Sequence, residues 1–165
     1  MELKSKERVL PVEIYTDGSL KKIGNKTFGG WSFIVVKDSK EQFIDSGSEN
    51  DTTNQRMELT AILKALKYIQ MHRKKSEKVI LYSDSAYFVN CFLQEWYLKW
   101  QANGWINSTG NDVANKDLWL EIIPFFDNFW YDFRKIEGHA GKYWNERADE
   151  LAQKQAKLSK QNWRG

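Results

Sequence analysis

Two aspartates stand where apolar segments give way to small polar residues. Asp17 ends the segment that begins at Ile14, and Asp84 ends the segment that begins at Ile80. If these segments are neighbouring parallel strands, both carboxylates emerge at the same edge of a sheet. Each aspartate could instead cap the turn or helix that follows it, which is a common structural role. The two acids alone leave both interpretations open.

Glu58 favours a chemical role, because it lies on a helix face that should pack against the sheet. Positions four, eight and eleven residues after it are Ile62, Leu66 and Ile69. A carboxylate at the start of such a face costs free energy unless it is paired or bound to a cation. Asp149 shows a similar pattern, although an acid in the first half of a helix also favours the helix dipole.

Four acids on four elements, without basic partners in their motifs, suggest a site for divalent cations. Hard cations prefer oxygen ligands, and the sequence has no Cys or His cluster for zinc. Two ions about 3.5–4 Å apart can hold the attacking and leaving oxygens of a phosphodiester displacement. Mg²⁺ suits this use because it keeps waters and accepts phosphate oxygens as ligands. The metal ligands that we predict are Asp17, Glu58, Asp84 and Asp149.

His139 lies between glycines, in the string Gly138-His139-Ala140-Gly141. Flanking glycines predict a mobile loop. A lone surface histidine usually has no special role, but this one precedes Asp149 by ten residues. It could therefore move a proton near the metals. For His72, at the end of a predicted helix, we expect only a favourable interaction with the helix dipole.

The elements that must position these groups follow from hydrophobic periodicity. We predict strands over 12–16, 31–37, 42–47, 79–83 and 130–136, with a turn over 21–30. We predict helices over 54–70, 85–93, 95–101, 113–128 and 143–158, with Pro124 as a kink or break in the fourth. The first three strands should form an antiparallel meander, and 79–83 should be central and parallel. The fold class is therefore α/β, with a five-stranded mixed sheet flanked by helices.

Length and composition fit a single globular domain. The chain has 165 residues, and its 8 Trp, 7 Tyr and 9 Phe supply a large core. We place the domain at 11–158, after a short extension over 1–10 and before a tail over 159–165. A single cysteine, Cys91, excludes an internal disulfide framework.

The same composition carries expectations about location and partners. No apolar run approaches the roughly 20 residues that span a bilayer, and the charged N-terminus lacks a secretory signal. We therefore expect a cytoplasmic protein without membrane contact. The net charge of +3 permits a polyanionic partner. Because the sequence gives no sign of an oligomer, we expect a monomer.

Six short strings in fixed order resemble type 1 ribonuclease H, the bacterial ribonuclease HI family. They are Tyr15–Ser19, Thr53–Leu59, Ser83–Ser85, Asp117–Trp119, Gly138–Gly141 and Asn145–Leu151. The resemblance covers about residues 11 to 156 and implies the ribonuclease H-like fold. It also implies an endonuclease that hydrolyses the RNA strand of RNA–DNA hybrids with Mg²⁺ or Mn²⁺, leaving 3′-hydroxyl and 5′-phosphate ends. By motif, the family's four metal-binding carboxylates match Asp17, Glu58, Asp84 and Asp149, and its catalytic histidine matches His139.

The resemblance further implies contacts to the substrate. Asn54 matches the residue that reads RNA 2′-hydroxyls, with Thr53 and Asn145 as further substrate-binding positions. Trp96 and Trp100 match the aromatic pair of the channel for the DNA strand. Four residues apart, they share one helix face, and we expect Trp96 to face the DNA and Trp100 to be mainly structural.

The chain departs from the family pattern in three places, one of which is Ala86 in place of the amide residue that often follows the Asp-Ser string. The first turn, 20–30, lacks the usual proline, and the helical hairpin over 91–116, usually basic, has no net charge. Positive charge lies instead around Lys21 and in the run from Arg73 to Lys78.

Two alternatives to a hybrid-cleaving enzyme stay open. One is a domain of the same fold that binds nucleic acid or a partner without cleaving, and the presence of all four carboxylates argues against it. The other is a DNA-cutting relative of the resolvase or exonuclease type. The Asn54–Leu59 string and Trp96 argue against this second alternative.

Overall fold

The computed structural model describes residues 9–136 and 138–164, without the side chains of residues 138–140. Three long strands form an antiparallel meander: β1 (Val12–Ile23), β2 (Lys26–Lys37) and β3 (Lys40–Asn50). The prediction of a meander is confirmed, but the strands are longer than expected. The predicted turn over 21–30 is present but much shorter than expected, because only residues 24 and 25 separate β1 from β2. Cross-strand pairing extends through lysines and glycines there, although their own β propensity is low.

Two short strands complete the sheet. β4 (Val79–Ser83) pairs in parallel with both β1 and β5 (Tyr131–Lys135), which gives the order β3-β2-β1-β4-β5. The predicted five-stranded mixed sheet, with 79–83 inside it and parallel to its neighbours, is confirmed.

Helices join and cover the strands. α1 (Asn54–His72) begins after Thr53, whose side chain accepts a hydrogen bond from the Arg56 backbone N–H. α2 (Ala86–Leu93) begins in the same way after Ser85 and is followed by α3 (Trp96–Ala102). The remaining helical elements are α4 (Lys116–Ile122), the short 3₁₀ helix η1 (Ile123–Phe125) and α5 (Gly138–Asn162).

Two helix predictions need correction. The single helix expected over 113–128 is confined to α4 and η1. The α-helix starts late because the backbone of Asn115 is in the left-handed region. It ends where Pro124, which has no N–H to donate, enters the 3₁₀ turn. The loop expected at residues 138–141 is instead the first turn of α5. Helical hydrogen bonding there outweighs the cost of two glycines, about 1 kcal/mol each.

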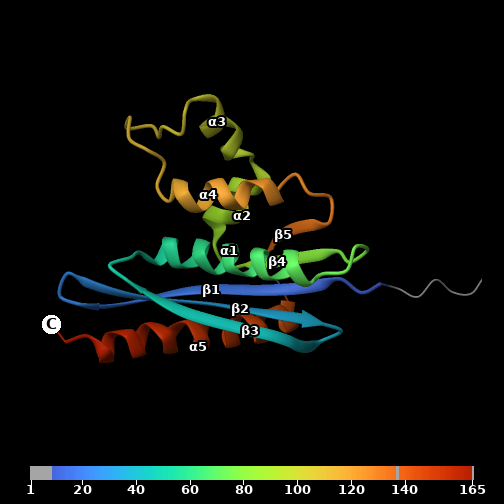
Figure 1. The fold of residues 1–165 in the computed structure, drawn as a ribbon, viewed down its shortest axis with the longest axis horizontal. Coiled ribbons are helices and arrows are strands. Elements are labelled where there is room, and N and C mark those ends of the chain that lie inside the picture. Colours follow the sequence, from blue (N-terminus) through green and yellow to red (C-terminus); the bar gives the residue numbers. More distant parts are fainter. Residues whose placement is uncertain (1–8, 137, 165) are drawn as a thin grey trace, which may run out of the picture.

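The sheet is covered on both faces. α1 lies on one face with α2, α3 and α4 beyond it, and α5 crosses the other face (Figure 1). Alternation along β2 serves both layers, because Phe33 and Val35 pack in the cluster with α1 while Ile34 and Val36 pack in the cluster with α5. This explains why the centre of β2 is apolar without interruption. None of the helices within the described residues is long and apolar enough to cross a membrane.

Small residues bring α5 close to the sheet. Ala148, Ala152 and Ala156 are fully buried on one stripe of α5. A Cβ on Gly30 of β2 would collide with the backbone of Ala152, so only glycine fits at this crossing. The buried Ser32 hydroxyl donates a hydrogen bond to the carbonyl of Ala148 and fixes the position of α5 along the strand.

Candidate active site

Strand register brings Asp17 and Asp84 to the same edge of the sheet. The parallel pairing of β1 and β4 ends at Thr16 opposite Ser83, and the two aspartates are the next residues on the chain. Beyond this point α2 carries the chain away from the sheet, while β1 continues beside β2. Asp17 therefore lies within β1, opposite Ser32, and not at a strand end as predicted.

Asp17 meets Asp149 of α5. Its side chain shares the strand face of Tyr15, which packs in the α5 layer, and it forms a hydrogen bond with the Asp149 side chain. Burial and that bond raise the pKa of Asp17 well above its usual range, and the charges of Asp149 and Glu58 add to the shift. A hydrogen bond of 2.9 Å from the Gly18 backbone N–H to Asp17 Oδ1 opposes it. Asp17 therefore holds a proton under conditions in which an isolated aspartate is ionised.

Glu58 approaches from the opposite layer. A Cβ on Gly18 would lie 2.5 Å from the Glu58 backbone nitrogen, so the glycine allows the first turns of α1 to press against β1. Burial raises the pKa of Glu58, a hydrogen bond from the Ser85 hydroxyl lowers it, and the charge of Asp84 raises it again. Glu58 and Asp84 thus form a second pair of neighbouring acids.

The donor set suits a hard divalent cation. None of the four acids forms an ion pair with a lysine or arginine in the part of the chain that the structure describes. The acids approach one another in the pairs Asp17–Asp149 and Glu58–Asp84, with Asp17 also within electrostatic reach of Glu58. Among the described residues, no three Asp, Glu, His or Cys side chains lie close enough together to hold a metal ion. Carboxylates that lack basic partners repel one another, and bound cations would relieve this repulsion.

The predicted 2′-hydroxyl contact lies beside these acids. The Asn54 side-chain nitrogen is 3.5 Å from Glu58 Oε1, at the exposed start of α1. Thr53 is exposed, and its hydroxyl serves as the helix cap. On α5, the Asn145 side-chain oxygen is buried and has no hydrogen-bond partner among the described residues.

The two tryptophans line one open groove of about 490 Å³ in the helical hairpin. Trp96 packs on Tyr87, with ring centroids 5.5 Å apart. Trp100 packs at 5.5 Å from the fully buried Trp119, and it also contacts Trp105. Both tryptophans are half-buried, so each combines a packing role with a face on the groove.

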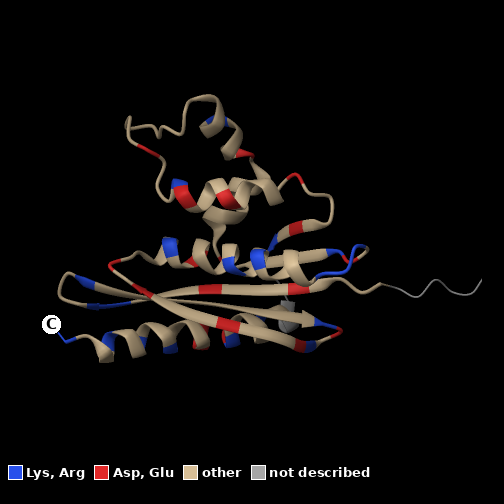
Figure 2. Ribbon diagram, in the orientation of Figure 1, with Lys and Arg blue, Asp and Glu red and all other residues tan. Residues whose placement is uncertain are grey.

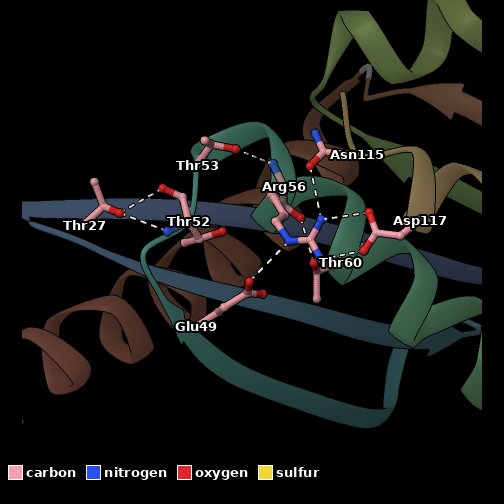
Figure 3. Close-up of polar contacts among 8 residues, drawn as sticks. All are labelled: Thr27, Glu49, Thr52, Thr53, Arg56, Thr60, Asn115 and Asp117. Atoms are coloured by element: carbon pink, nitrogen blue, oxygen red, sulfur yellow. Dashed lines mark hydrogen bonds and ion pairs between the residues drawn. The ribbon is translucent and has the colours of Figure 1, made fainter. Parts of the chain in front are cut away.

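Arg56 is a residue of this region that sequence analysis missed. It joins the start of α1 to α4 through a two-pronged contact with Asp117, at 2.8 and 3.0 Å (Figure 3). It also contacts Glu49 on β3 and the side-chain oxygen of Asn115. The contact with Arg56 lowers the pKa of Asp117 below its usual range. Arg56 and Asp117 belong to two of the strings that match the family, Thr53–Leu59 and Asp117–Trp119. This was the only feature of the sequence that could have pointed to the pair.

The two histidines lie near opposite ends of two different helices. The side chain of His139 lies outside the described part of the structure, and its backbone belongs to the first turn of α5. His72 is exposed at the end of α1, where its ring stacks on Tyr68 with centroids 4.1 Å apart. No described contact links His72 to the four acids.

Comparison with known proteins agrees with this arrangement. The sequence profile of the RNase H family matches residues 10–157. A protein of Syntrophomonas wolfei named ribonuclease H is 45% identical over 139 residues, which are 84% of this chain and 91% of that protein. LC9-RNase H1, described as a type 1 RNase H with the type 2 active-site motif, superposes with a TM-score of 0.70 at 28% identity, over 94% of this chain and 76% of that one.

A viral enzyme shares the fold. The foamy viral protease-reverse transcriptase, solved in complex with RNA/DNA hybrid, superposes with a TM-score of 0.79 at 19% identity. The match covers 96% of this chain and 22% of the viral one. At this identity the likeness concerns the fold alone.

The fold, the acidic sheet edge and these relatives define one class of protein, a nuclease with a ribonuclease H-like fold. The chain belongs to the ribonuclease H family, as a bacterial type 1 member.

Proposed function

We propose that this protein is an endonuclease that hydrolyses the RNA strand of RNA–DNA hybrids and leaves 3′-hydroxyl and 5′-phosphate ends. The observation that carries the proposal is the group of four acids around the edge where the pairing of β1 and β4 ends. These acids lack basic partners in the described structure, and their sequence strings match the family in order. We assign the catalytic domain to residues 11–158.

In this proposal Asp17, Glu58, Asp84 and Asp149 hold two Mg²⁺ ions, for which Mn²⁺ can substitute. Bound there, the ions would activate a water and stabilise the charge that develops on the phosphate. The chain supplies the rest. Close packing at Gly18 and Gly30 sets the distance of α1 and α5 from β1 and β2, and so fixes carboxylates from opposite layers at one edge.

Substrate selection is assigned to groups around the acids. Asn54 lies beside Glu58 on an exposed helix start, where its amide can meet a 2′-hydroxyl of the attacked strand. Thr53 and Asn145 are assigned to the same strand, and the unpartnered oxygen of Asn145 suits a donor on the substrate. Trp96 and Trp100 offer ring surface to the opposite strand in the hairpin groove.

The experiment uses a hybrid with either strand labelled, with and without Mg²⁺. We expect cuts in the RNA strand only, and no cuts in double-stranded DNA. Asp84→Asn should lose nearly all cleavage in Mg²⁺, yet still bind the hybrid, because phosphate contacts elsewhere carry much of the affinity. Cleavage of both strands would favour the DNA-cutting alternative, and substantial cleavage by Asp84→Asn would refute the metal assignment.

His139 is assigned an accessory role in proton transfer and product release. General acid–base help is typically worth ~10²–10⁴-fold, with less expected from a residue outside the metal group. His139→Ala should therefore lower kcat by about one to two decades while barely changing hybrid affinity. The measurement is kcat at saturating hybrid and fixed Mg²⁺ between pH 6 and 9. A wild-type rate across this range would show that the histidine takes no part.

A further inference from the structure

Positive charge gathers at one end of the molecule, away from the helical hairpin. From Leu151 to the last residue, α5 and the chain after it carry Lys154, Lys157, Lys160 and Arg164, and no acid. The adjacent β1–β2 hairpin carries further lysines and no acid between residues 18 and 37. Basic residues are clustered at this end of α5 and of the hairpin in Figure 2.

Four of these lysines line a single groove. Lys21 of β1 faces Lys154, Lys157 and Lys160 of α5 across an open groove of about 590 Å³, which also includes Gln153 and Glu150. We call it the α5 lysine groove. None of its four lysines takes part in an ion pair within the described residues, so their charges are available to a polyanion.

The groove is continuous with the candidate active site. Gln153 Nε2, from the groove, donates a hydrogen bond to Asp149 Oδ2 at 2.7 Å. Asp149, Gln153, Lys157 and Lys160 follow one another at helical spacing on one face of α5. At ~1.5 Å per residue, this stripe extends roughly 16 Å from the acid. That length corresponds to about five nucleotides along one strand of a duplex.

Other basic surfaces fit a phosphate backbone less well. The helical hairpin has two lysines balanced by two acids. In the run after α1, Arg73 donates hydrogen bonds to carbonyls of its own loop and lies over the rings of Trp130 and Tyr131. The contacts of this arginine are thus already made within the fold. The loop after α1 lies at the opposite end of the sheet from the β1–β2 turn and the C-terminal end of α5 (Figure 1).

We propose that the α5 lysine groove binds backbone phosphates of the nucleic acid that flanks the cleaved position. The proposal rests on the hybrid-cleaving function proposed above. It assigns to α5 the electrostatic attraction for phosphates that the helical hairpin, with no net charge, does not provide. Lysines that meet phosphates position a duplex and carry no sequence information. The groove therefore adds affinity and leaves the choice between RNA and DNA to Asn54 and its neighbours.

The test compares two triple variants with the same change in net charge. Lys154→Gln/Lys157→Gln/Lys160→Gln removes three charges from the groove. Lys40→Gln/Lys75→Gln/Lys78→Gln is the matched control, because its three exposed lysines lie on the loops and strand starts at the other end of the sheet. The measurements are kcat and KM for a hybrid of about 18 base pairs, at salt concentrations from about 50 to 200 mM. The hybrid Kd is measured in EDTA over the same range.

For the groove variant we expect KM and Kd to rise at least about tenfold at the highest salt, with kcat within about twofold of wild type. The slope of log affinity against log salt should fall by about 0.9 for each phosphate that no longer meets a lysine, and so by about 2 to 3 in total. The control should keep the wild-type values. Shortening the hybrid to about six base pairs should weaken binding by the wild type far more than by the groove variant.

Equal KM, Kd and salt slope for the two triple variants would overturn the proposal. A fall in kcat without a change in Kd would overturn it as well, because the lysines would then act at the reacting centre. If the wild type cleaves no hybrid, the proposed function fails, while the Kd values in EDTA still decide whether the groove binds a nucleic-acid duplex.

Discussion

At the scale of single residues, the proposed function of Asp17 and the stability of the fold oppose each other. The raised pKa of Asp17 means that the folded protein binds a proton more tightly than the unfolded chain does. In the absence of metal, the free energy of unfolding therefore falls as pH rises above the ordinary range of an aspartate, because the folded state must then hold a charge that it disfavours. Above this pH range, Asp17 therefore lowers the stability of the metal-free fold.

Asp17→Asn removes this charge and should raise Tm in EDTA, with a larger gain at pH 8 than at pH 5. The measurement is thermal unfolding at both pH values. Asp45→Asn is a matched control: Asp45 also accepts a hydrogen bond from the next backbone N–H, at 2.8 Å, but is exposed on β3. An equal shift in both variants, or a loss of stability in Asp17→Asn, would contradict the electrostatic explanation.

Cys91 has a side chain that can react, but solvent and reagents cannot reach it in the folded protein. It is fully buried on α2, and burial raises the pKa of its thiol to about 12. Because the thiolate is the reactive form, a thiol reagent should label the folded protein no faster than the protein unfolds. Complete labelling within the mixing time at pH 8, without denaturant, would show that α2 opens readily.

At the scale of elements, the Arg56–Asp117 contact couples the start of α1 to α4. The first turn of α1 carries Asn54 and Glu58, while α4 packs against the aromatic groove through Trp119. Two parallel hydrogen bonds to one carboxylate fix both distance and angle. The contact is therefore placed to hold the proposed 2′-hydroxyl contact of Asn54 in register with the proposed groove for the opposite strand.

Arg56→Lys keeps the charge but loses the planar fork, so we expect KM for the hybrid to rise several-fold, with kcat little changed and stability lower by about 1–2 kcal/mol. Kinetics and urea unfolding measure the two effects. Lys67→Met is the control, since Lys67 joins α1 to Glu121 of α4 by an exposed pair at 2.9 Å, worth about 0–1 kcal/mol. A similar rise in KM for both variants would remove the special role of Arg56.

At the scale of the whole molecule, acid stability depends in part on a buried carboxylate outside the candidate active site. Burial would raise the pKa of Glu77, but hydrogen bonds from the Lys37 side chain and the Lys74 backbone N–H lower it below the usual value. Glu77 is only 5% exposed and ties the end of β2 to the loop after α1. Since its folded pKa is depressed, it stabilises the fold above the ordinary glutamate pKa, and this contribution disappears as pH falls through the folded value.

Glu77→Gln should therefore lower the free energy of unfolding at pH 7 and have a much smaller effect near pH 3. The measurement is urea unfolding at both pH values. The exposed Glu121→Gln serves as a control with little effect expected at either. A constant difference between wild type and Glu77→Gln from pH 7 to pH 3 would show that packing, and not charge, is what the substitution removes.

The sequence by itself determined most of the element order and the candidate chemistry. Periodicity placed Glu58 on the inner face of a helix, and short strings in fixed order pointed to the four acids and to the family. These signals are local, because a helix face or a strand end is fixed by residues that are neighbours in the chain. The same locality explains why the length of β1 was not predicted, since β1 extends beyond Asp17 only because β2 pairs with it. In the helix predicted over 113–128, the break at Pro124 was expected, but the late start after the left-handed backbone of Asn115 was not.

Only the tertiary structure decided which groups meet. It placed Asp17 against Asp149 and Glu58 against Asp84, through close approaches that Gly18 and Gly30 permit. It also joined Arg56 to Asp117, 61 residues apart in the chain, and gathered lysines from β1 and α5 into one groove. These contacts depend on how the helices pack on the sheet and on one another, and no pattern of neighbouring residues encodes those distances.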